Sequence, residues 1–368
     1  MPHRSGARAL VLTLLIAFAL PAVPATATDK YAGEFLRVGA GARALGMGGA
    51  FLAVADDATA GFWNPAGLTY LEYKSVQYMH AEEQHSQVAY DFLGVVLPQG
   101  TEVGKRSALG VSVVRLGVDD IPVSKRTIEQ LVAGEDFEDG DGNPSTNLPT
   151  EGNGVWDVGE RLRLDENDFT YKSSNDFAGL FSYARNLSPK FTLGGSLKVL
   201  YRTLVGHSAW GAGLDAGLTY ELAQHATLAV VARDMTTTFM SWDTGTSESI
   251  APSLSFGGQV TKPLGTQHVI TGSADVRLDF ESERIDSNFG SDGMAGELHV
   301  GAEYWYHNAL ALRSGVSGRD LTFGAGFRRK GLGIDYAAIF NRQFGSDVDF
   351  AADENQGVAH RVSGSFDW

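Results

Sequence analysis

The sequence contains no cysteine. Its absence excludes disulfides, thiolate metal sites, a cysteine nucleophile and a lipid-modified N-terminal cysteine. Basic residues are also scarce, with 29 Lys and Arg against 44 Asp and Glu and a net charge of −15. Because binding to nucleic acid requires clustered Lys and Arg to neutralise phosphates, we exclude nucleic acid as a partner.

Long hydrophobic runs are missing beyond residue 27, where no stretch reaches 18 apolar residues, so no transmembrane helix is expected there. Residues 1–27 have the layout of a secretory signal peptide. Arg4 and Arg8 precede an apolar stretch of 12 residues (9–20), and Ala-Thr-Ala at 25–27 forms a cleavage site. Twelve residues are too few to span a bilayer core of ~30 Å, which favours cleavage over anchoring. The exported chain is then periplasmic, secreted or an outer-membrane barrel.

Glycine (45 residues) and aromatic residues (10 %) are plentiful, which favours closely packed strands over helices. From Ser75 onward, apolar and polar residues alternate with period 2. In residues 210–222, for example, Leu214 and Leu218 share one face, whereas Asp215 and Thr219 share the other. This alternation fits a soluble sandwich with an apolar core and equally a membrane barrel with an apolar face toward lipid.

Four features favour an all-β transmembrane barrel. Many predicted strands have 10–16 residues, whereas strands of globular proteins have ~5–6. Aromatic residues lie near strand ends, the number of strands is even, and the long connections (119–168, 235–250, 282–293 and 343–357) all follow odd-numbered strands. We therefore predict a barrel of 14 antiparallel strands whose termini both face the periplasm of the outer membrane. The strands are expected at 75–82, 86–98, 106–118, 169–186, 190–205, 208–222, 226–234, 251–262, 266–281, 294–307, 309–318, 320–329, 331–342 and 358–368.

The polar faces of these strands carry charges of both signs, which a barrel places in its lumen. They are Lys198, Arg202, Asp215, Asp275, Arg277, Asp279, Glu297, His299, Glu303, Arg313, Arg328, Asp335 and Arg361.

At the C-terminus, Phe366 and Trp368 end an amphipathic strand. A terminal aromatic residue of this kind resembles the signal that the barrel-assembly machinery recognises; the alternative is an ordinary last strand.

Residues 28–74 precede the strands and do not alternate. Gly39 and Gly41 have the Gly-x-Gly spacing that opens a dinucleotide loop, but they follow no strand and the full Gly-x-Gly-x-x-Gly pattern is missing. Residues 41–68 read GARALGMGGAFLAVADDATAGFWNPAGL. This stretch resembles the N-terminal signature of the PorV/PorQ family, within the wider FadL-type outer-membrane barrels.

The resemblance implies that residues 28–74 fold into the lumen as a hatch, with the motif Asn64, Pro65, Ala66 and Gly67 against the inner wall. It leaves two functions open. A PorV/PorQ-like protein is an accessory to protein secretion or surface attachment, with exported proteins as partners. A FadL-like protein is a channel for small hydrophobic molecules. Either one contacts outer-membrane lipid and neither needs a cofactor.

The connection at 119–168 holds 14 acidic and four basic residues, which account for most of the net charge. Carboxylates and amides on a Gly-rich turn suit Ca²⁺, with candidate ligands Asp139, Asp141, Asn143, Asp157 and Glu160. Counted from Asp139, position 6 is Pro144 and position 12 is Thr150, so the loop is not a standard EF-hand. The alternative is a solvated acidic loop.

An enzyme is not expected. The sequence has no Gly-x-Ser-x-Gly motif. His207 and His225 are predicted to lie at opposite ends of the barrel, too far apart to act together.

Overall fold

The structure is a computed structural model that describes residues 33–83, 88–100, 102, 104–125, 169–280, 287–291, 293–340 and 358–368. The predicted signal peptide, residues 1–27, lies outside this range. Among the described residues, no helix is both long and apolar enough to cross a membrane. Four short helices come first: η1 (Glu34–Val38), α2 (Ala42–Gly46), α3 (Ala60–Trp63) and η2 (Pro65–Tyr70).

The remaining described residues form one antiparallel β-sheet. Its strands are β1 (Ser75–Glu83), β2 (Val88–Gln99), β3 (Ser107–Ser124), β4 (Phe169–Ser188), β5 (Phe191–Leu204), β6 (His207–Ala223), β7 (Ala226–Arg233), β8 (Thr238–Trp242), β9 (Ser247–Ile250), β10 (Ser253–Leu264), β11 (His268–Asp279), β12 (Phe289–Ser291), β13 (Met294–Tyr306), β14 (Leu310–Ser317), β15 (Asp320–Arg329), β16 (Leu332–Phe340) and β17 (Val358–Asp367).

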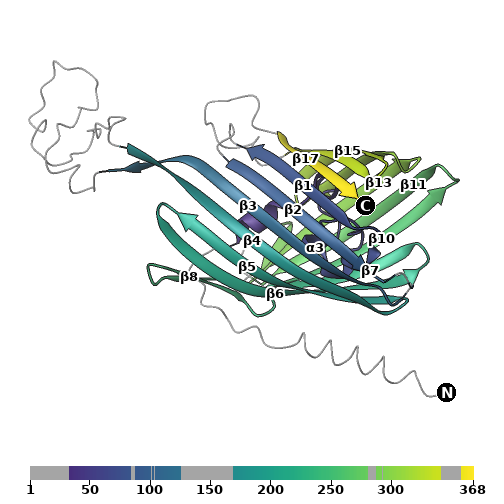
Figure 1. The fold of residues 1–368 in the computed structure, drawn as a ribbon, viewed down its shortest axis with the longest axis horizontal. Helices are drawn as coiled ribbons and strands as arrows, with labels where there is room; N and C mark the ends of the chain where they lie inside the picture. Colours follow the sequence, from purple (N-terminus) through teal and green to yellow (C-terminus); the bar gives the residue numbers. More distant parts are fainter. Residues whose placement is uncertain are drawn as a thin grey trace, which may run out of the picture.

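Fourteen of these strands close into a barrel (Figure 1). The first and last strands, β1 and β17, pair with each other, and β7 pairs directly with β10. The three other strands belong to connections: β8 pairs with β6 and β9, and β12 pairs with β13. The predicted 14-stranded antiparallel barrel is therefore confirmed, with an additional hairpin inside the connection expected at 235–250.

The predicted strand ends agree with the structure to within two residues, except for one that was wrong by six. The acidic connection was expected to begin at residue 119, but β3 continues to Ser124. The strand shifts register between Val118 and Ile121 and then pairs again with the start of β4. Asp120 adopts a φ of 58°, which Asp tolerates better than most residues. The irregularity interrupts the alternation of side chains and so hid the end of the strand.

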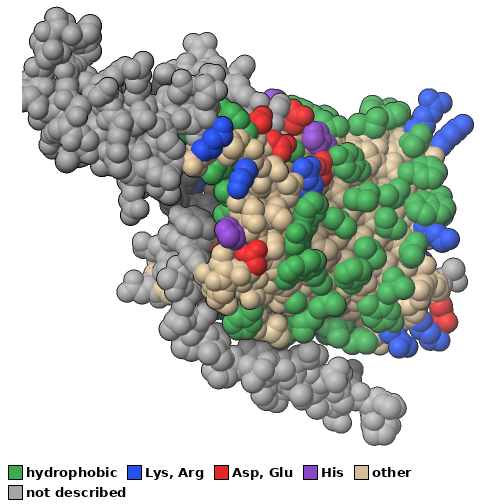
Figure 2. Space-filling view, turned by 60° about the vertical axis from the view of Figure 1, so that its left-hand side comes forward, with side chains coloured by type: hydrophobic (Ala, Val, Ile, Leu, Met, Phe, Trp, Pro, Cys, Tyr) green, Lys and Arg blue, Asp and Glu red, His purple; other side chains and the backbone are tan. Residues whose placement is uncertain are grey.

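The side chains are arranged inside out relative to a soluble protein. On β5, Leu197 is 46 % exposed and its neighbour Lys198 only 2 %. On β6, Leu214 is 45 % exposed and Asp215 only 9 %. Figure 2 shows the exposed hydrophobic side chains as a broad band across the face in view, with charged residues toward both ends of the band. An apolar exterior around a polar interior fits a barrel in lipid and excludes the soluble sandwich.

The two ends of the barrel differ in their connections. We call the end with the β4–β5, β6–β7 and β15–β16 turns the short-turn end, at the right of Figure 1. The opposite end, which carries the β3–β4 and β16–β17 connections, is the long-loop end. Trp368 lies at the short-turn end, where its backbone N–H donates to the carbonyl oxygen of Lys74, just before β1.

Residues 33–71 lie inside the barrel. Helix α2 contacts β14, β15, β16 and β17, whereas η2 contacts strands β2 to β6. The segment thus crosses the lumen from one part of the wall to another. Its many Gly and Ala residues allow close contact with the strands, and nearly every residue from 40 to 69 is buried.

Candidate functional site in the barrel lumen

A chain of buried ion pairs holds α2 against one side of the lumen. Arg43 donates to Glu303 twice, from Nε to Oε2 at 2.9 Å and from Nη2 to Oε1 at 2.8 Å. Glu303 also accepts from Arg313 at 2.6 Å, and Arg313 donates to Asp335 at 2.9 Å. Asp335 accepts from Arg328 at 2.6 Å. Because the charges alternate in sign, each buried ion has a partner that offsets its loss of hydration.

A second set of polar contacts holds other parts of the N-terminal segment. Arg37 donates to Asp279 and to Glu297, both at 2.9 Å. The backbone N–H of Leu52 donates to Oδ2 of Asp275 at 2.9 Å. Four acidic residues of the wall therefore contact the segment, two from β11 (Asp275 and Asp279) and two from β13 (Glu297 and Glu303). The mixed-sign lumen expected from the sequence is present, and part of it serves to dock this segment.

The Asn64–Gly67 motif lies against β5 and β6. The side chain of Asn64 donates from Nδ2 to the carbonyl oxygen of Leu52 at 2.8 Å and accepts from the N–H of Ala66 at 3.0 Å. Asn64 therefore closes the turn that begins η2 and ties it to a residue 12 positions earlier. Gly67 packs so closely that a Cβ there would lie 2.1 Å from the carbonyl oxygen of Ala55.

The barrel wall beneath this motif is made of glycine. A Cβ on Gly217 would lie 2.1 Å from Oδ1 of Asn64, and a Cβ on Gly194 would lie 2.4 Å from the backbone N of Ala66. Backbone and side-chain atoms do not approach a Cβ so closely, so no larger residue fits at either position. The motif and the two wall glycines form one close-packed contact.

One part of the lumen is apolar. Trp63 packs edge-on against Phe62 with ring centroids 5.4 Å apart, and Phe62 packs against Phe92 of β2 at 6.3 Å. Trp63 also donates from Nε1 to the carbonyl oxygen of Ala40 at 2.7 Å. The surrounding apolar cluster lies in the middle and the long-loop half of the barrel. Its buried members are Phe35, Ala40, Ala42, Leu45, Met79, Ala81, Tyr90, Phe92, Val114, Ala178, Leu180, Leu200, Ala209, Met240 and Ala337.

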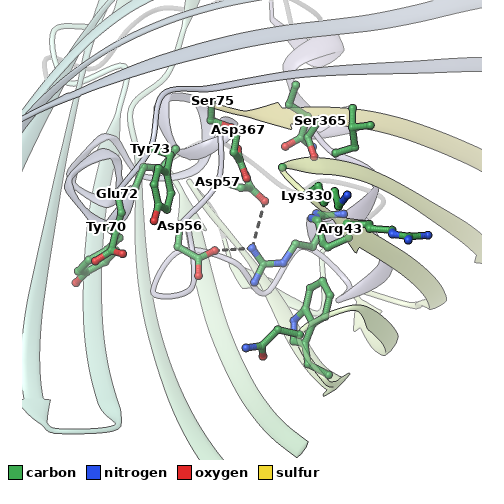
Figure 3. A pocket seen from close by; sticks show the side chains of 18 of the residues that line it. Arg43, Asp56, Asp57, Tyr70, Glu72, Tyr73, Ser75, Lys330, Ser365 and Asp367 are labelled. Atoms are coloured by element: carbon green, nitrogen blue, oxygen red, sulfur yellow. Dashed lines mark hydrogen bonds and ion pairs between the residues drawn. The ribbon is translucent and has the colours of Figure 1, made fainter. Parts of the chain in front are cut away.

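A cavity of about 560 Å³ opens at the short-turn end, beside the N-terminal segment. Figure 3 shows Arg43 within it, joined to Asp56 and Asp57. Trp305 also lines the cavity, and the guanidinium of Arg328 lies 5.7 Å from its ring. The cavity is thus mixed in charge, unlike the apolar cluster on the other side of the segment.

The predicted assembly signal lies at the short-turn end. Phe366 and Trp368 both point outward, and their rings stack with centroids 5.9 Å apart. Their part in assembly stays a prediction.

The five predicted calcium ligands lie outside the described residues. They are Asp139, Asp141, Asn143, Asp157 and Glu160. Within the part of the chain that the structure describes, no three His, Asp or Glu side chains gather as a metal site.

The two histidines lie at opposite ends of β6, as predicted. His207 begins the strand at the long-loop end, and His225 lies in the β6–β7 turn. Nδ1 of His207 lies 3.1 Å from Asp243 in the β8–β9 hairpin. The backbone N–H of Ser208 donates to Asp243 at 3.0 Å, which lowers the pKa of this exposed carboxyl. These contacts hold the β8–β9 hairpin against the long-loop end of the barrel.

Sequence reasoning did not identify Arg37 and Arg43 as anchors. Their acidic partners on the barrel wall lie more than 240 residues away in the chain, so no local spacing reveals these pairs. One signal was available. These are the only two cations between residues 36 and 71, in a stretch otherwise rich in small residues. A cation inside a buried segment requires an acidic partner.

No family model and no curated protein matches this sequence. Solved structures do match. The toluene transporter TbuX of Ralstonia pickettii is 15 % identical, with a TM-score of 0.52 over 90 % of this chain and 98 % of its own. The channel CymD, described as a monoaromatic hydrocarbon channel, is 15 % identical, with a TM-score of 0.54 over 90 % and 98 %. The toluene transporter TodX of P. putida is 12 % identical, with a TM-score of 0.51 over 90 % and 99 %.

The chain has the fold of these hydrocarbon channels. The FadL-type barrel expected from the N-terminal motif is thereby confirmed as an architecture. None of these three neighbours is a PorV/PorQ protein, so the narrower assignment gains no support from them.

Proposed function

We propose that this protein is a channel for small hydrophobic molecules in the bacterial outer membrane. The observation that carries the proposal is the apolar cluster that faces the lumen, with Phe92, Leu180 and Leu200 among its buried members. A water-filled barrel has a polar lumen, whereas apolar side chains turned inward offer a binding surface for an apolar molecule. The solved channels of the same fold, described as toluene and monoaromatic hydrocarbon carriers, support this choice.

In this proposal, residues 28–74 act as the hatch and residues 1–27 as a cleaved signal for export. The hatch fills the lumen between the apolar cluster and the cavity at the short-turn end. Because its contacts with the wall are close, a molecule passes only if part of the hatch moves. The long-loop end then faces the cell exterior, which follows the usual placement of long loops in such barrels.

Uptake of radiolabelled toluene tests the proposal in cells that lack channels of their own. Replacing Met79 and Leu200 with Gln adds polar groups to the apolar cluster, and we expect uptake to fall several-fold. The matched control is the Leu93→Gln/Leu197→Gln variant, on the outward faces of β2 and β5. Uptake by this control at the wild-type rate, per folded barrel, is the expected result.

The alternative function, an accessory to protein secretion or surface attachment, rests on the PorV/PorQ-like motif at residues 41–68. It predicts a different phenotype. Deleting the gene would release exported proteins from the cell surface and leave toluene uptake unchanged. That pair of results would overturn the proposed channel.

A further inference from the structure

Four cations lie on the outward face of the barrel at its short-turn end. They are Lys74, which immediately precedes β1, Arg185 on β4, Lys262 on β10 and Arg329 on β15, and all four are exposed. We call these four residues the basic rim. Figure 2 shows Lys and Arg side chains gathered along this edge of the hydrophobic band on the face in view.

Each rim residue continues a row of lipid-facing side chains. On β15, Phe323 and Phe327 point outward, and Arg329 is the next residue in that series. On β10, Lys262 follows Val260 in the same way. The apolar stem of a Lys or Arg can therefore lie along the band while its charged group reaches the interface.

The acidic residues at this end are placed differently. Glu72 and Asp367 line the cavity, which Arg329 also borders, and Glu221 belongs to the inward-facing series of β6. Glu102 is paired with Lys105 at 2.8 Å. The outward edge is therefore positive, although the protein as a whole carries a net charge of −15.

The rim residues are spread around the barrel and act separately. They lie on β4, β10 and β15 and directly before β1, and these strands are three or four apart in the closed order. At ~4.8 Å per strand, neighbouring cations are roughly 15–20 Å apart, farther than one lipid headgroup extends. No ion pair joins any of the four to another residue that the structure describes.

We propose that the basic rim binds the phosphate groups of anionic phospholipids in the leaflet at the short-turn end. The charge sign, the position at the edge of the apolar band and the absence of acidic partners in the described chain all suit an anionic headgroup. Juxtamembrane cations attract such lipids in proportion to their number. The proposal rests on the membrane placement given above and adds the lipid class to it.

The test uses the full chain reconstituted in vesicles of equal phosphatidylcholine and phosphatidylglycerol. After gentle detergent extraction, the lipids retained by the protein are counted. We expect wild type to retain phosphatidylglycerol in excess, and this excess should shrink as salt screens the charges. The Arg185→Gln/Lys262→Gln variant removes half of the rim and should lose about half of the excess.

The matched control is Lys190→Gln/Lys330→Gln, which removes the same charge from turns at the same end. It should retain the wild-type excess. Equal retention of both lipids by wild type, or an equal loss in the two variants, would overturn the proposal. So would displacement of the lipid by inorganic phosphate beyond the effect of chloride at the same ionic strength, since that result indicates a site for free anions.

Measuring toluene uptake on the same preparations separates the two proposals. Wild type that takes up toluene but shows no preference for phosphatidylglycerol overturns the lipid proposal alone. Wild type that shows the preference without toluene uptake overturns the channel alone. A chain that does not enter vesicles overturns both.

Discussion

Docking of the N-terminal segment depends strongly on Arg43, because this side chain makes both hydrogen bonds of a bidentate pair with Glu303. In the Arg43→Ala variant, the acids Asp56 and Asp57 lose their cation and Glu303 keeps only Arg313. Removing one member of a buried pair costs about 3–5 kcal/mol, and we expect the docked state of the segment to lose stability on that order. Hydrogen exchange of residues 40–69 should accelerate while exchange of the strands stays slow.

The control for this prediction is Arg43→Met/Glu303→Met. It removes both members of the pair, so no charge of the pair remains without its partner, and it should be less destabilising than Arg43→Ala. Slow exchange of residues 40–69 in Arg43→Ala would show that the segment is held by its packing alone.

The depth of a residue in the apolar band should decide how much it tolerates a charge. Leu197 lies in the middle of β5, and Leu222 lies near the short-turn end of β6. We expect Leu197→Arg to lower the free energy of unfolding by about 2–4 kcal/mol and Leu222→Arg by about 0–1 kcal/mol. Denaturant unfolding of the two variants in vesicles measures the difference; equal costs would count against a membrane-spanning band.

Gly217 should be irreplaceable, because its missing side chain makes room for Asn64. We expect Gly217→Ala to displace the Asn64–Gly67 turn at a cost of about 1–3 kcal/mol. Gly272→Ala on β11 is the matched control, since a Cβ there meets no atom within 4 Å. The melting temperature should fall for the first variant and hold for the second. Equal melting temperatures for the two variants would show that the turn can move aside at little cost in stability.

At the scale of elements, β17 closes the barrel and its end provides a clear test. Its residues pair with β1 and β16, and the N–H of Trp368 donates to the carbonyl of Lys74 at 2.9 Å. Deleting Trp368 should leave the chain unassembled in the periplasm, sensitive to protease and without heat-modifiable migration in gels. A Trp368→Phe variant keeps a terminal aromatic and should assemble. Normal heat-modifiable migration of the deletion variant would contradict the predicted role of Trp368 in assembly.

The barrel strands were predictable because lipid and lumen impose opposite demands on successive residues. Leu197 beside Lys198 and Leu214 beside Asp215 show that contrast directly in the sequence. The β8–β9 hairpin was not predictable in the same way, because its strands of five and four residues are too short to establish a period. The ion pair of Arg43 with Glu303 was also hidden, since it depends on how a closed barrel brings distant strands to one helix.

At the scale of the whole molecule, orientation and the acidic connection can be tested together. If residues 126–168 face the exterior and bind Ca²⁺, millimolar Ca²⁺ should protect them from protease added outside the cell. The Asp139→Ala/Asp157→Ala variant should lose this protection while its barrel still assembles, because it lacks two of the carboxylates that would bind the ion. Cleavage that is indifferent to Ca²⁺ indicates a solvated loop, and cleavage only from the periplasm inverts the orientation.

The position of the N-terminal segment has a consequence for the order of events during biogenesis. Residues 33–74 leave the ribosome before any strand, yet Ala42 donates to Ser363 and Arg43 to Glu303, 321 and 260 residues later in the chain. Contacts across such long stretches form late because the intervening chain must first be ordered. Although residues 33–74 are synthesised before the strands, they are therefore the last to reach their final place, and they stay undocked until the final strand has joined the first.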